Sequence, residues 1–61
     1  MKLEELLGKH VGYRGEEGHV VEGHFDEKEA SVVVSIRGAA NLPRRNLIVP
    51  ESEWDEFELL G

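Results

Sequence analysis

The chain has 61 residues, a formal net charge of −6 and no cysteine. Its length allows one domain, over residues 1–61, that buries only about 60% of its unfolded surface. The lack of cysteine excludes disulfides and thiolate metal sites, and the negative charge disfavours nucleic acid and anionic membranes as partners. No apolar run approaches the roughly 20 residues of a membrane helix, and the N-terminus does not read as a signal peptide. We therefore expect a cytoplasmic protein.

The first elements follow from apolar spacing and glycine. Leu3, Leu6 and Leu7 recur at helical spacing, which predicts a short helix over residues 2–7 that stops at Gly8. Residues 10–14 then read as a strand, and residues 15–18, with glycine at both ends, read as a turn.

Two strands joined by a polar turn are expected next. Residues 19–25 alternate, with Val21, Gly23 and Phe25 on the predicted core face and Val20 outside. A glycine inside a strand indicates a bend, a bulge or a close backbone approach. After a turn over residues 26–29, residues 30–37 form the clearest strand of the chain, with its odd and even positions on opposite faces.

The rest of the chain predicts a loop over residues 38–43, a strand over residues 45–49 and a short strand over residues 57–60. Ser52 is placed to cap a single helical turn before the last strand. The expected core consists of Leu6, Val11, Val21, Phe25, Val32, Val34, Ile36, Leu47, Val49, Phe57 and Leu59.

The order of these segments resembles the small SH3-like barrels. The resemblance is carried by four segments in this order: a leader "LEELLGKHV", then "GHVVEGHFDE", "ASVVVSIRG" and "NLPRRNLIV". This turn placement and apolar spacing are similar to those of Tudor and KOW-type modules, over about residues 8–60. A weaker resemblance is to Sm-like proteins, through the glycine spacing before Phe25-Asp26 and through Ile36-Arg37-Gly38. The resemblance implies an all-β, SH3-like barrel of four to five strands with a short N-terminal helical turn.

The residues that could carry chemistry do not form a recognised motif. The three histidines lack metal-ligand spacing, and His19 and His24 are an odd number of positions apart, so we expect them on opposite faces of a strand. The acids lie in runs that read as solvated, and no nucleophile motif or phosphate loop is present. We therefore predict no enzyme activity, no cofactor and no metal.

Aromatic and basic residues are the better candidates for binding. In Tudor-like barrels, aromatic side chains near the first hairpins form cages for methylated lysine or arginine, and Tyr13 lies near the corresponding turn. Trp54 either covers the end of the barrel or forms an exposed anchor for a partner. Arg37, Arg44 and Arg45 form the one basic cluster, while residues 51–58 carry five acids. These opposite charges could pair within one chain or between chains.

The sequence thus predicts a non-enzymatic protein-interaction or assembly module that self-associates as a homo-oligomer. Its expected partner-binding residues are Tyr13, Arg37, Arg44, Arg45 and Trp54. One alternative is a nucleic-acid-binding module of the KOW or Sm-like kind. Another is a small acidic inhibitor, of the kind that phages encode, that occupies a nucleic-acid-binding enzyme.

Overall fold

The computed structural model describes residues 1–38 and 41–61. The expected loop over residues 38–43 therefore lies partly outside the described residues. The elements, in chain order, are α1 (Leu3–Leu6), β1 (His10–Tyr13), β2 (Glu16–Phe25), β3 (Ala30–Ile36), β4 (Arg45–Pro50), the 3-10 helix η1 (Glu51–Glu56) and β5 (Glu58–Leu59). The α-helix has four residues, too few to cross a bilayer, and the described residues contain no other candidate for a membrane-spanning helix.

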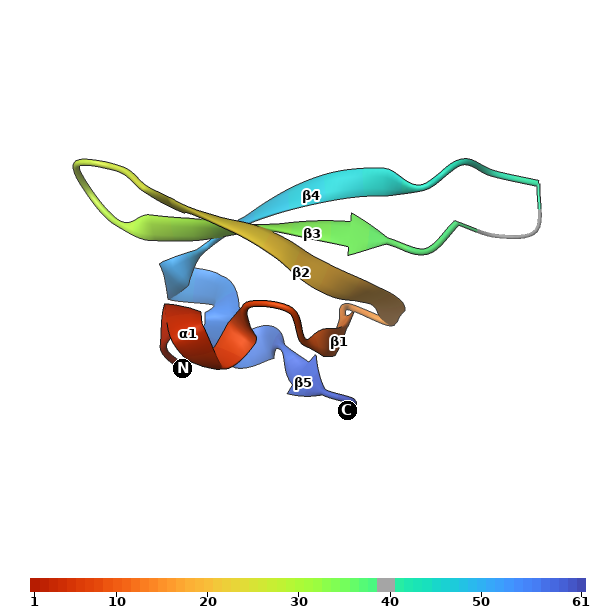
Figure 1. Cartoon of the computed structure of the whole chain (residues 1–61), viewed down its shortest axis with the longest axis horizontal. Coiled ribbons are helices and arrows are strands. Elements are labelled where there is room, and N and C mark those ends of the chain that lie inside the picture. The colour runs from red at the N-terminus through yellow and green to blue at the C-terminus, as the bar shows by residue number, and fades with distance from the viewer. Residues whose placement is uncertain (39–40) are drawn as a thin grey trace.

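The five strands form one antiparallel sheet in the order β4-β3-β2-β1-β5. Figure 1 shows β2, β3 and β4 as a long twisted layer, with α1, β1, β5 and η1 gathered on one side of it. The η1 segment carries the chain from one edge strand to the other, so the sheet curls around its own core. The expected small all-β fold of four to five strands with a short N-terminal helical turn is confirmed.

The turn between β1 and β2 is shorter than the glycine spacing predicted. Arg14 and Gly15 make a two-residue turn with φ values of 50° and 81°. Positive φ at both central positions is the geometry that matches the twist of a tight hairpin, and glycine adopts it without strain. The prediction of a turn over residues 15–18 was therefore wrong, and residues 16–18 begin β2 instead.

A β-bulge in β2 reverses the predicted inside and outside at Val20 and Val21. Val20 pairs with Val34 and Glu22 pairs with Val33, so Val21 is an extra residue without a partner. Val20 is consequently buried and Val21 is exposed, which is the opposite of the prediction.

Beyond the bulge, β2 leaves the core. Phe25 pairs with Ala30 near the tip of the hairpin, where its side chain is 80% exposed and not in the predicted core. Gly23 is where the strand approaches another segment closely, because a Cβ atom at that position would lie 2.7 Å from the Leu3 side chain. The bulge or close approach expected from a glycine within this strand is therefore confirmed for Gly23.

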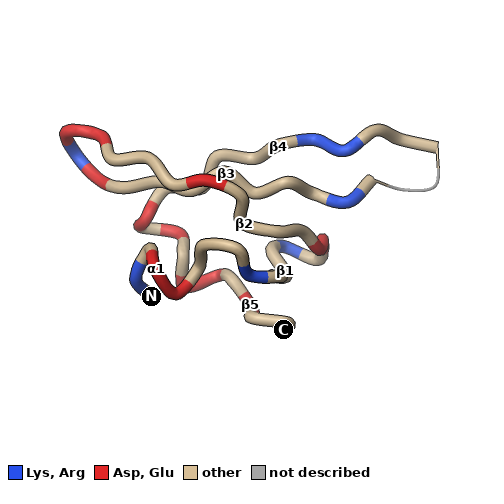
Figure 2. Tube along the Cα trace, viewed as in Figure 1, with Lys and Arg blue, Asp and Glu red and all other residues tan. Residues whose placement is uncertain are grey.

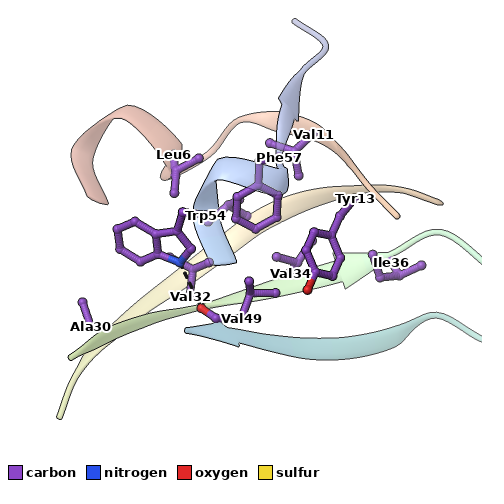
Figure 3. Packing of buried hydrophobic residues seen from close by; sticks show 11 residues of the cluster. Leu6, Val11, Tyr13, Ala30, Val32, Val34, Ile36, Val49, Trp54 and Phe57 are labelled. Atoms are coloured by element: carbon purple, nitrogen blue, oxygen red, sulfur yellow. Dashed lines mark hydrogen bonds between the residues drawn. The ribbon is translucent and has the colours of Figure 1, made fainter. Parts of the chain in front are cut away.

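The hydrophobic core lies between the long layer and the segments packed on it, as Figure 3 shows. The strict alternation of β3 puts four of its side chains into the core, as predicted. Leu59 is exposed and Leu47 is only partly buried, so neither is a full core residue. The buried cluster consists of Leu6, Val11, Tyr13, Val20, Ala30, Val32, Val34, Ile36, Val49, Trp54 and Phe57.

The helical turn expected around Ser52 is present as η1, but without the predicted cap. Pro50 occupies the capping position, and no side chain caps the segment. The backbone N–H of Ser52 instead donates to the Glu29 carboxylate at 3.1 Å. This contact ties the start of η1 to the hairpin between β2 and β3.

Candidate interaction surface

The predicted binding residues gather near one end of the sheet, with one exception. Arg37 follows β3 and Arg44 precedes β4, so both lie at the end of the molecule that carries the β3–β4 loop (Figure 2). Arg45 begins β4, opposite Ile36. Tyr13 ends β1 next to the β1–β2 turn, while Trp54 lies in η1.

Tyr13 is part of the core and not an open aromatic wall. Its side chain is 8% exposed, and its ring packs against Phe57 with 5.1 Å between ring centroids. The hydroxyl donates a hydrogen bond to Glu53 at 2.9 Å, and the Arg14 guanidinium lies 5.1 Å from the ring centroid. Burial, with the hydrogen bond to Glu53, raises the pKa of the Tyr13 hydroxyl above its ordinary value.

Trp54 covers the core, which is the first of the two roles that its sequence context left open. The residue is 2% exposed, and its indole Nε1–H donates to the carbonyl of Val49 at 3.0 Å (Figure 3). The bond occupies an acceptor of edge strand β4. The indole is therefore not available as an exposed anchor in this structure.

Two acids of η1 pair with Arg14, a basic residue that the sequence analysis did not single out. Arg14 Nε and Nη2 donate to the two carboxylate oxygens of Glu56 at 3.0 and 3.1 Å, and Nη2 also donates to Glu53 at 2.7 Å. The hydrogen bond from Arg14 lowers the pKa of the Glu56 carboxyl. Because Arg14 and these acids are about 40 positions apart in the chain, only the fold brings them together.

The three arginines of the basic cluster differ in the contacts that they make. Arg45 forms an ion pair with Glu16, whereas Arg37 and Arg44 make no ion pair with any residue of the described ranges. The predicted pairing of this cluster with residues 51–58 is therefore not made within the described part of the chain. Arg37 and Arg44 instead line a cleft of about 270 Å³. That cleft also contains His10, Glu17, Gly18 and His19.

The register places both strand histidines of β2 on one face. His19 pairs with Ser35 and His24 pairs with Ser31, and these two serines lie on the same, outward side of β3. The prediction that His19 and His24 face opposite sides was wrong, because the bulge at Val21 adds one residue between them. His10 pairs with His19 across β1 and β2, and the two rings stack with 4.8 Å between centroids.

The outward side of β3 and β4, which we call the uncharged face, has no ionisable side chain. In a chain with 33% charged residues, such a face is unusual. Ile48 lies near its centre and is 70% exposed, next to the half-buried Val33 with which it pairs. The bulge residue Val21, 57% exposed, lies on the adjoining strand. The uncharged face consists of Ser31, Val33, Ser35, Asn46, Ile48 and Pro50.

Comparison with known proteins gives no relative for this chain. No protein-family model, no curated protein sequence and no solved structure matches it. Its function must therefore be argued from its own residues.

Proposed function

We propose that this chain is a non-enzymatic interaction module that assembles with a second copy of itself through the uncharged face. The observation that carries the proposal is the exposed Ile48, 70% accessible, which lies among the uncharged outward side chains of β3 and β4, with Glu22 on the adjoining strand β2. Exposed apolar side chains grouped on a face without charge are typical of protein-binding surfaces. The small or flat side chains around Ile48 leave its surroundings accessible to another sheet, as in packed β-sandwiches.

The charges at the two ends of the molecule favour a second copy as the occupant. The hairpin between β2 and β3 carries Asp26, Glu27 and Glu29 beside Lys28, a net charge of −2, at one end of the 37 Å long axis. Arg37 follows β3 and Arg44 precedes β4, so both lie at the opposite end of the long layer (Figure 2). In a two-fold arrangement of two stacked sheets, each basic end meets the acidic end of the other copy. The same stacking brings the two Ile48 side chains toward the shared axis.

The size of the chain is compatible with such a contact. Its accessible surface is 4334 Å², and a standard interface takes about 800 Å² from each partner. This is about a fifth of the surface, so the contact would involve most of the uncharged face and its charged ends. A domain of this length has a small core, and burial between copies adds stability in proportion to the apolar area removed from water.

Replacing Ile48 tests the proposal directly. Burying this side chain contributes about 1–2 kcal/mol on each of two symmetric sides, so Ile48→Glu is expected to weaken the dimer roughly 100-fold or more. Sedimentation equilibrium at tens of micromolar should give twice the chain mass of 6.9 kDa for the wild type and a single-chain mass for the variant. Circular dichroism verifies that the variant remains folded.

The matched control is Leu59→Glu. Leu59 is 49% exposed and lies in β5, at the opposite edge of the sheet from β4 and away from the proposed contact. This variant should remain dimeric. A single-chain mass for the wild type at these concentrations, or equal dissociation by both variants, would refute the proposal.

A further inference from the structure

The cleft of about 270 Å³ at the loop end of the sheet combines cationic and imidazole groups from four segments. His10 comes from β1 and His19 from β2, and their rings stack with an interplanar angle of 13°. Arg37 comes from the end of β3 and Arg44 from the residue before β4. The four side chains are therefore brought to one place by strand pairing and not by sequence proximity.

The local charge of this cleft is positive although the chain as a whole is acidic. Arg37 and Arg44 make no ion pair within the described residues, so both guanidinium groups keep their donors free of carboxylates there. The one acid that lines the cleft is Glu17, whose carboxylate lies 3.4 Å from His10 Nε2. The net charge of the lining is thus positive even with neutral imidazoles, and protonation of either ring increases it.

Remote acids oppose an anion only weakly. Glu58 pairs with Gly12, which pairs with Glu17, so Glu58 lies two strands away from Glu17 across the sheet. Glu53 and Glu56 of η1 are engaged with Arg14, which does not line the cleft. Interactions between exposed charges are screened over about 8 Å at physiological ionic strength, so the near groups determine the local potential.

We propose that this cleft binds a phosphate group, as inorganic phosphate or as a phosphate monoester. Two guanidinium forks match the spacing of phosphate oxygens and hold them by charge-assisted hydrogen bonds. The imidazoles of His10 and His19 line the same cleft and can add N–H donors. The cleft has room for a compact tetrahedral anion but not for a large apolar ligand. All the lining residues belong to one copy, so a single copy is sufficient for binding, and in the proposed dimer a phosphate would compete with the partner's acidic end for Arg37 and Arg44.

The test uses the full chain carrying Ile48→Glu, so that the result does not depend on the oligomeric state. Inorganic phosphate and O-phosphoserine are titrated in separate experiments at constant ionic strength, with chloride as the balancing anion. We expect saturable NMR shifts in the imidazole signals of His10 and His19. Saturation by phosphoserine and not by phosphate assigns the monoester as the ligand, and saturation by both assigns the phosphate group itself.

Four substitutions distinguish this site from general charge attraction. Arg37→Gln and Arg44→Gln should each weaken binding at least tenfold. Arg45→Gln makes the same change at the neighbouring arginine, which pairs with Glu16, and should weaken binding less than twofold. Glu17→Gln removes the single negative charge of the cleft and should tighten binding. Unsaturable shifts equal to those caused by chloride, or an equal loss in all three arginine variants, would overturn the proposal.

Discussion

Gly18 provides the sharpest test of the sheet geometry, because the backbone of the next strand leaves no room for a side chain at this position. Gly18 lies in β2 between Val11 of β1 and Ile36 of β3. A Cβ atom there would lie 2.5 Å from the Ser35 carbonyl oxygen and 3.1 Å from the Ser35 carbonyl carbon. Backbone atoms in a paired strand cannot move aside as the end of a side chain can. Gly18→Ala therefore requires the β2–β3 pairing to open.

The expected cost can be set against the total stability. Overpacking a tight site costs about 1–3 kcal/mol and occasionally more, and the backbone contact places Gly18→Ala at about 3 kcal/mol. A domain of 61 residues has a free energy of unfolding of roughly 3–9 kcal/mol, at about 0.05–0.15 kcal/mol per residue. With an m-value of about 1 kcal/mol per molar urea, the unfolding midpoint should fall by about 3 M or the variant should not fold.

Gly12→Ala is the matched control, and its expected effect has the opposite sign. Gly12 lies on β1 next to the pairing partner of Gly18, and a Cβ atom there would meet Leu60 and Glu58 side-chain atoms at 3.6–3.7 Å, an ordinary contact. Alanine at such a position restricts the unfolded chain and stabilises by about 0.4–1 kcal/mol. Both midpoints are measured by circular dichroism in urea at one protein concentration. Equal destabilisation by both substitutions would refute this account of the sheet.

Two further predictions concern the buried aromatic residues. Trp54→Phe leaves the Val49 carbonyl without its donor, so we expect a loss of about 2 kcal/mol and a melting temperature lower by roughly 10 °C; an unchanged melting temperature would contradict the role of this hydrogen bond. The pKa of Tyr13 is raised in the folded state, so the neutral hydroxyl contributes stability that is present below the ordinary pKa of 10.0 and is lost as the pH rises through the folded value. Urea midpoints measured from neutral to alkaline pH should fall less steeply in Tyr13→Phe, and identical pH profiles would contradict this prediction.

The sequence alone determined the elements whose signals are local. The alternation of residues 30–36 predicted which side chains of β3 are buried, because successive side chains of a strand point to opposite faces. The leucine spacing of the leader predicted a helical turn, and the turn at residues 26–29 was found where its polar residues placed it. Together with the chain length, these signals predicted a small all-β barrel.

The tertiary structure alone determined which faces and which partners the remaining residues have. A single extra residue at Val21 exchanged the buried and exposed positions of Val20 and Val21, and the place of Phe25 near the hairpin tip left its side chain exposed. Tyr13 read as a binding aromatic, and Trp54 read as either a cover of the barrel end or an exposed anchor, until the pairing of β1 and the course of η1 placed both inside.

For the charged residues and the histidines, too, the partners were decided by the tertiary structure and not by the local sequence. The ion pairs of Arg14 with its two carboxylates and the stacking of His10 on His19 are contacts that no local sequence pattern predicts. The physical reason is that hydrophobic periodicity is a property of neighbours along the chain. Register, bulges and ion pairs depend instead on which strands lie side by side, and this is decided only when the sheet closes around its core.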